Sequence, residues 1–155
     1  MLFPNMTVRQ NIAFGVPAAS ADVVEEALQR FQLMGFSKSK PWKLSGGERQ
    51  RVAVARAAAS AITAEGGLLL LDEPFAGLHL PLRNELLECL RGWVAERKTP
   101  VLSVTHDVGE AFQLGAEVIK FSEGKVVQQG PVELVLAEER ERLMEQLSRG
   151  RHNNL

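Results

Sequence analysis

Residues 44–50 of this chain read Leu44-Ser45-Gly46-Gly47-Glu48-Arg49-Gln50, and the Ala-, Val- and Arg-rich residues 51–60 that follow predict a helix. Ser45 and Glu48 have the S-x-x-E spacing of a capping box, in which each side chain bonds the other residue's backbone N–H. Gly46 and Gly47 have no Cβ, so a phosphate could approach the backbone closely. The N–H groups and the positive end of the helix dipole would then point at that anion. For the S-x-x-E spacing alone, a well-capped helix preceded by two glycines is a sufficient explanation.

A second segment, residues 68–74, is an apolar run that ends abruptly in two carboxylates and a proline, Leu-Leu-Leu-Leu-Asp72-Glu73-Pro74. A continuous apolar run is typical of a parallel strand that is covered on both faces. In such sheets ligands lie beyond the carboxyl ends of the strands, where Asp72 and Glu73 are expected. A buried strand followed by an acidic turn would produce the same run of residues.

A third segment repeats this order of strand and polar end. Residues 101–105 are apolar and β-branched, and His106 and Asp107 follow them. His106 is therefore expected at the same edge of the sheet as Glu73. A histidine at a strand end is also a common surface residue, and His79 and His152 have weaker claims to a function.

Together these segments resemble the ATP-binding cassette (ABC) transporter ATPases. Residues 44–50 resemble the signature motif of that family, residues 68–74 its Walker B motif, and residues 1–15 the segment after the Q-loop of importer subunits. The resemblance implies an α/β fold, the C-terminal part of a P-loop NTPase-type ABC ATPase domain. The chain would be one partial domain over 1–155. A helical subdomain with the signature would span about 1–60, and the Walker B and switch-histidine part of the core, with the C-terminal helices, about 61–155.

The resemblance also implies a role for each candidate residue. Ser45, Gly46, Gly47 and Glu48 would contact the ATP of the partner subunit, in trans. Asp72 would hold Mg²⁺ through water, Glu73 would polarise the attacking water, and His106 would be the switch histidine, so Glu73 and His106 are the implied catalytic residues. The D-loop, which contacts the opposite subunit, would comprise Ala76, Gly77, Leu78 and His79. The family usually has Asp where His79 stands, which puts that contact in question.

ATP and Mg²⁺ are the implied cofactors. The implied partners are a second nucleotide-binding subunit, in a homodimer, and the transmembrane permease, which would hold the chain on the inner face of the cell membrane. The solute would be molybdate or another oxyanion first, and otherwise a polyamine, iron or a sugar. Two alternatives remain open: a non-catalytic interaction module that donates the signature in trans or docks a permease, and a soluble ABC protein of repair or translation.

Composition is compatible with this assignment. The chain has 155 residues, 45% hydrophobic and 24% charged, which suits one globular domain. Its formal net charge of −1 offers no basic field for nucleic acid. Cys89 is the only cysteine, which excludes an internal disulfide and suits a reducing, cytoplasmic compartment. No apolar stretch has the length needed to span a bilayer.

The P-loop is missing from these residues. Its pattern is G-x-x-x-x-G-K-[ST], but the only Gly-Lys pair, Gly124-Lys125, has Ile119 in place of the first glycine and Val126 after the lysine. We therefore expect the polypeptide by itself to bind Mg-ATP weakly and not to hydrolyse it. Without the P-loop strand and helix, the remaining strands should keep unpaired edges and an uncovered apolar surface. A truncated gene, a mis-assigned start or a fragment would each explain the pattern.

The other elements follow from local signals. Helices are expected from residues 5–8 onward with Thr7 as a cap, over 22–34 with Gly35 as the stop, from Pro81 to before Thr99, and over 108–114, 132–136 and 138–147. A hairpin is expected over 118–121 and 125–129 around residues 122–124. A frayed tail is expected from Arg149.

Overall fold

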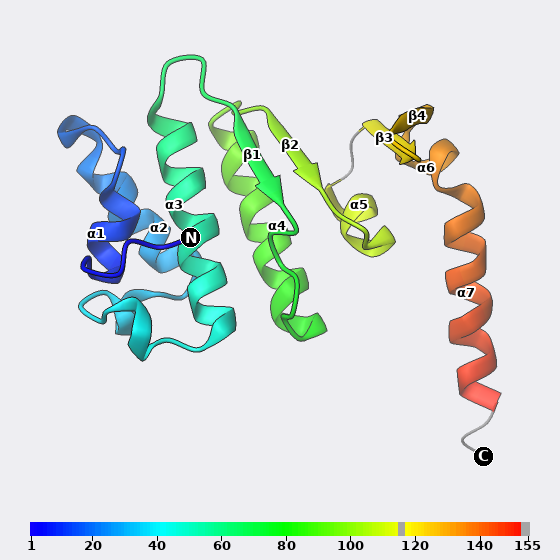
Figure 1. Cartoon of the computed structure of the whole chain (residues 1–155), viewed down its shortest axis with the longest axis horizontal. Coiled ribbons are helices and arrows are strands. Elements are labelled where there is room, and N and C mark those ends of the chain that lie inside the picture. The colour runs from blue at the N-terminus through cyan, green and yellow to red at the C-terminus, as the bar shows by residue number, and fades with distance from the viewer. Residues whose placement is uncertain (115–116, 153–155) are drawn as a thin grey trace. The chain divides into compact units, whose positions relative to one another are not determined.

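The structure is a computed structural model that describes residues 1–114 and 117–152, with side chains described as far as residue 145. It divides into two compact units, Met1–Val104 and Thr105–Leu155. Figure 1 shows the helices and strands of both units.

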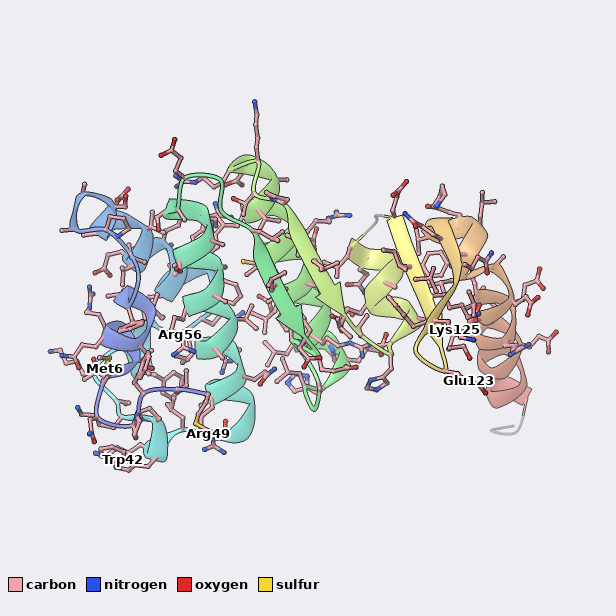
Figure 2. The ribbon with its side chains drawn as sticks, turned by 45° about the horizontal axis from the view of Figure 1, so that its top comes forward. Met6, Trp42, Arg49, Arg56, Glu123 and Lys125 are labelled. Carbon is pink, nitrogen blue, oxygen red and sulfur yellow. The ribbon has the colours of Figure 1, made fainter. Side chains whose placement is uncertain are left out.

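The first unit begins with three helices, α1 (Val8–Ala13), α2 (Ala21–Arg30) and α3 (Gly46–Thr63). Short 3₁₀ turns at Ala18–Ser20, Met34–Phe36 and Pro41–Lys43 connect them. The predicted cap of α1 is confirmed, because Thr7 forms a capping box with Gln10. Helices α1 and α2 both pack against α3, and Figure 2 shows Arg56 on the side of α3 that faces the N-terminal segment.

Helix α2 ends earlier than the sequence predicts. The predicted stop at Gly35 is wrong, because the helix closes at Arg30 and Gln32 takes a left-handed backbone with φ of 55°. The Leu33 N–H donates to the Leu28 carbonyl at 2.7 Å and the Gln32 N–H donates to the Gln29 carbonyl at 3.1 Å. These two bonds form a Schellman motif, which terminates a helix and is usually built on glycine.

The sheet of the first unit pairs β1 (Leu69–Asp72) with β2 (Val101–Val104) in parallel, so that Leu69 faces Val101 and Asp72 faces Val104. Helix α4 (Leu80–Glu96) joins the two strands, as a parallel pair requires. Leu69 and Leu71 of β1 are buried, whereas Leu70 is 63% exposed. The predicted uncovered apolar surface is therefore confirmed.

Helix α4 covers one face of the sheet formed by β1 and β2. Figure 1 shows it behind β1 and β2, and its buried residues are Leu86, Leu87, Leu90, Trp93 and Val94. Pro81 is the second residue of the helix, in its first turn as expected. Ion pairs tie the end of α4 to α2, with Arg30 bonded to Glu96 at 2.7 Å and Arg97, the C-cap of α4, bonded to Glu26 at 2.9 Å.

The second unit contains α5 (Val108–Leu114), a hairpin of β3 (Glu117–Ser122) and β4 (Lys125–Pro131), α6 (Val132–Val135) and α7 (Ala137–His152). The predicted hairpin is confirmed, and Figure 2 labels Glu123 and Lys125 at its tip. Glu123 and Gly124 have φ values of 49° and 74°, the left-handed pair that a two-residue type I′ turn requires. Val132, Val135 and Leu136 form the core of this unit.

The last helix is longer than predicted. The expected frayed tail from Arg149 is wrong over residues 149–152, because α7 continues to His152, and residues 153–155 lie outside the described part. No glycine or proline breaks residues 137–148, and pairs such as Arg142 with Glu138 at 3.4 Å have the i,i+4 spacing that supports a helix. Within the described residues, no helix is long and apolar enough to cross a membrane.

Candidate functional site

The first turn of α3 is closed by the predicted capping box. Ser45 has an extended backbone, and its Oγ accepts a hydrogen bond from the Glu48 N–H at 3.3 Å. The Glu48 carboxylate in turn accepts the Ser45 N–H at 2.6 Å. The pKa of the Glu48 carboxyl is lowered, first by the hydrogen bond from the Ser45 N–H and next by its hydrogen bond with the Ser45 side chain. The cap is confirmed, and it fixes where the helix begins.

The two glycines at this helix start have different surroundings. A Cβ placed on Gly46 would have no heavy atom within 4 Å, so the space around this residue is open. A Cβ placed on Gly47 would lie 2.8 Å from Cδ2 of Leu78. The first N–H groups of a helix have no carbonyl to bond within the helix, so those of Gly46 and Gly47 point out of its start. Gly46 therefore lies on the open side of the turn, where an anion could approach.

The carboxylates predicted at the end of β1 are where the sequence placed them. Asp72 is the last residue of β1 and is exposed, and Glu73 follows it, partly buried. The Glu73 N–H donates to the Val104 carbonyl of β2 at 2.9 Å, which continues the ladder one residue beyond β1. The backbone of Glu73 is left-handed, with φ of 47°. This turn points the chain away from the sheet immediately after the second carboxylate.

Gln50 connects these two parts of the site. Its Nε2 donates to the carbonyls of Glu73 at 3.1 Å and of Pro74 at 2.9 Å, across 23 and 24 residues of sequence. Gln50 lies within the signature string, but no role was predicted for it. It lies three residues after Gly47 and so shares a helix face with it, but no sequence signal indicates which segment that face contacts.

The segment expected to be the D-loop packs on the same helix. Leu78 contacts the position of Gly47, and its N–H donates to the Phe75 carbonyl at 3.3 Å. His79, which stands where the family usually has Asp, is the N-cap of α4, and its Nδ1 accepts the Leu82 N–H at 3.4 Å. The signature turn and this loop are therefore neighbours within one subunit.

His106 belongs to the second unit, where it is exposed immediately before α5. Asp107 accepts the Glu110 N–H at 2.9 Å, and the Asp107 N–H donates to Thr105 Oγ1 at 3.1 Å, so this turn begins α5. The predicted proximity of His106 to Glu73 stays a prediction.

Asp72 offers a carboxylate of the kind that Mg²⁺ uses. Mg²⁺ keeps several waters and is commonly held by one or two carboxylates together with the phosphates of its nucleotide. An exposed Asp at a strand end provides such a ligand, directly or through water. In the part of the chain that the structure describes, no group of three or more His, Cys, Asp or Glu is placed to hold a metal by protein ligands alone.

Comparison with known proteins agrees with this geometry. The model of the family described as ABC transporter matches residues 1–76, which include the signature and Walker B segments. The sulfate/thiosulfate import ATP-binding protein CysA of Synechocystis is 44% identical over 138 residues. The molybdate/tungstate import ATP-binding protein WtpC of Thermococcus kodakarensis is 42% identical over 142 residues. The chain belongs to the ABC transporter ATPase family.

The matched relatives and structures are longer than this chain. The match covers 85% of the chain and 38% of the Synechocystis protein, and 88% and 42% for the Thermococcus protein. The dimeric structure of a bacterial ABC transporter cassette superimposes with a TM-score of 0.71 and 27% identity, over 84% of this chain and 59% of that one. A post-hydrolysis cassette bound to ADP and Pi gives 0.70. The predicted α/β ABC ATPase fold is thereby confirmed.

Proposed function

We propose that this chain supplies the signature and Walker B parts of the ATP-hydrolysing subunit of an ABC importer. One observation carries the proposal: the capped, glycine-opened start of α3 is joined by Gln50 to the segment that bears Glu73. A helix start of this kind stabilises an anion through its N–H groups and dipole. A carboxylate at the end of a parallel strand is suitably placed to orient a water molecule.

Each site residue takes the role that the family motif gives it. Asp72 would hold Mg²⁺ through water, and the bound ion would neutralise charge on the nucleotide phosphates. Glu73 accepts a hydrogen bond from the attacking water and aims it at the γ-phosphate, with His106 beside that phosphate. Ser45, Gly46, Gly47 and Glu48 form the signature turn that contacts ATP held by a second subunit. Phosphoryl transfer of this type depends on position and charge more than on covalent chemistry.

The proposed partners and solute follow from the relatives. The matched cassette structure is dimeric, and we propose that this subunit also pairs with a second copy through residues 76–79 and the signature turn. The relatives named above import sulfate, thiosulfate, molybdate or tungstate, and another, from Rhodospirillum rubrum, imports molybdenum. We propose a tetrahedral oxyanion as the solute and a membrane permease as the docking partner, at the cytoplasmic face.

Glu73→Gln tests this function in a subunit in which a family P-loop segment precedes the chain. The substitution keeps the shape of the side chain and removes the carboxylate that polarises water. Phosphate release should fall at least 100-fold while ATP binding persists, and an ATP-bound dimer should accumulate on a sizing column. Asp22→Asn, at an exposed position of α2, is the matched control and should leave the rate unchanged. A rate near that of the parent subunit in Glu73→Gln would remove Glu73 from the mechanism.

A second candidate function is that of a non-catalytic module that lends its signature turn to a partner with a complete P-loop. The open space at Gly46, at the capped start of α3, is compatible with it. On either proposal, the 155-residue chain alone should show no micromolar binding of Mg-ATP in isothermal titration and no phosphate release. Stimulation of a separate P-loop-bearing subunit by added chain would select the module.

A further inference from the structure

Gln50 contacts the backbone of the proposed catalytic carboxylate directly. The amide nitrogen of Gln50 has two hydrogens, and two carbonyl oxygens, those of Glu73 and Pro74, lie 3.1 and 2.9 Å from it. Both neighbours are acceptors, which fixes the orientation of the amide, because its own oxygen would be repelled there. Each hydrogen of the nitrogen therefore has its own carbonyl.

The residue held in this way has an unusual backbone. Glu73 has φ of 47°, in the left-handed region that costs free energy for residues other than glycine. Such a conformation persists only where the surroundings impose it. The Glu73 N–H is fixed by the Val104 carbonyl of β2, and the Glu73 carbonyl is fixed by Gln50 of α3 and by the Ala76 N–H at 3.3 Å. Two separate elements thus hold the two sides of this residue.

We propose that Gln50 is a positioning residue for Glu73: its amide holds the left-handed turn at Glu73 and Pro74 and so sets the direction of the Glu73 carboxylate. The sheet fixes the N–H side of the residue, whereas on the carbonyl side Gln50 acts together with the bond from the Ala76 N–H. Gln50 also lies on the helix whose first turn carries the signature glycines. A displacement of α3 therefore moves the Glu73 carbonyl, and the carboxylate with it. This inference rests on the proposed role of Glu73.

Amide hydrogen exchange on the 155-residue chain tests the proposal without any nucleotide. In Gln50→Leu the side chain keeps its bulk and loses both donors, so the amides of Glu73, Ala76 and Leu78 should exchange roughly tenfold faster or more. The strong NOE between the N–H and Hα protons of Glu73, a signature of positive φ, should weaken. Gln29→Leu, at an exposed position of α2, is the matched control and should change neither signal.

Gln50→Glu adds a test that separates positioning from general loss of structure. An ionised carboxyl can only accept hydrogen bonds and would face two carbonyl oxygens, whereas a protonated one donates its O–H to one of them. The introduced carboxyl should therefore titrate above its ordinary pKa of about 4.3. Exchange at Ala76 and Leu78, corrected for intrinsic rates, should slow at least threefold as the pH falls from 7 through that pKa. The parent chain and Gln50→Leu should show no such step.

The outcomes separate this proposal from the proposed function. Exchange within twofold of the parent at all three amides in Gln50→Leu, with the Glu73 NOE retained, overturns the role of Gln50. If Gln50→Leu unfolds α3, the pH step in Gln50→Glu decides instead, and a flat profile overturns the role. Failure of the proposed function would appear elsewhere, as an unchanged hydrolysis rate in Glu73→Gln.

Discussion

Gly46→Ala asks whether the fold or a ligand requires the first signature glycine. Gly46 is the first residue of α3, and a Cβ there would meet no heavy atom within 4 Å. Alanine is favoured over glycine in a helix by about 0.5–1 kcal/mol, because glycine loses more backbone entropy on folding. We expect Gly46→Ala to raise the free energy of unfolding by up to that amount. At this chain length, 1 kcal/mol corresponds to about 2–4 °C in Tm.

Gly47→Ala is the matched substitution one residue later. Its Cβ would lie 2.8 Å from Cδ2 of Leu78, so the Leu78 side chain must shift. A displaced side chain costs about 0.5–1.5 kcal/mol, which offsets the gain in helix propensity. The free energy of unfolding should therefore stay near that of the parent or fall slightly. In a Leu78→Ala background, which removes the clashing side chain, Gly47→Ala should raise the free energy of unfolding by its gain in helix propensity. The two substitutions should therefore show a favourable coupling free energy.

Urea unfolding followed by fluorescence measures both variants. Trp93 is fully buried and Trp42 is 64% exposed, so Trp42→Phe in every protein restricts the signal to the core of the first unit. In a subunit with a P-loop, Gly46→Ala should also lower ATP turnover at least tenfold, because a methyl group then stands where the phosphate approaches. A loss of more than about 0.5 kcal/mol in Gly46→Ala would contradict the structural argument. Unchanged turnover would contradict the ligand argument.

Four further predictions concern stability, each measured by urea unfolding monitored by circular dichroism. Ser45→Ala should cost about 1 kcal/mol through loss of the cap. Folding lowers the pKa of Glu48, so the ionised carboxylate stabilises the fold above the unfolded pKa of about 4.3, and this stabilisation is lost as the pH falls through the lower folded pKa. In Glu48→Gln the free energy of unfolding should therefore decline less on the acid side than in the parent chain. An equal decline in both proteins would disprove the assignment. His79→Asp should stabilise the chain by a few tenths of a kcal/mol or more, since Asp is a preferred N-cap, and a loss would argue against capping. Leu71→Ala should lower the free energy of unfolding by about 2–4 kcal/mol, and Leu70→Ala, on the exposed side of the same strand, by less than about 0.5 kcal/mol. Equal losses would refute the conclusion that only one face of this strand is covered.

Local signals explain what the sequence predicted correctly. The cap at Ser45 depends on a side chain three residues away, and the hairpin tip depends on Glu123 and Gly124 alone, so neither needs tertiary information. The carboxylates at the end of β1 were predictable because an apolar run that stops abruptly marks the end of a strand. Each of these features is decided within about six residues of sequence.

The contacts that assemble the site could not be predicted in the same way. Gln50 bonds the carbonyl of Glu73, which lies 23 residues later in the sequence, and Gly47 lies against Leu78. Both contacts depend on how α3 packs beside β1. The early end of α2 depends on Gln32, which takes a left-handed backbone without being glycine. Its side chain donates to Glu85 of α4 at 2.6 Å, a contact that no local pattern indicates. Tertiary packing decides these positions.

The departure from the family pattern at His79 has a structural explanation. The family usually has Asp there, and Asp is a preferred N-cap because its carboxylate accepts a backbone N–H of the first helical turn. In this chain His79 occupies the N-cap of α4, and Nδ1 of its imidazole accepts the Leu82 N–H instead. A ring nitrogen can replace a carboxylate oxygen as an acceptor but brings no negative charge to the positive end of the helix dipole. The imidazole of His79 therefore caps α4 without the negative charge that Asp would bring, and the loop before this helix lies beside the signature turn.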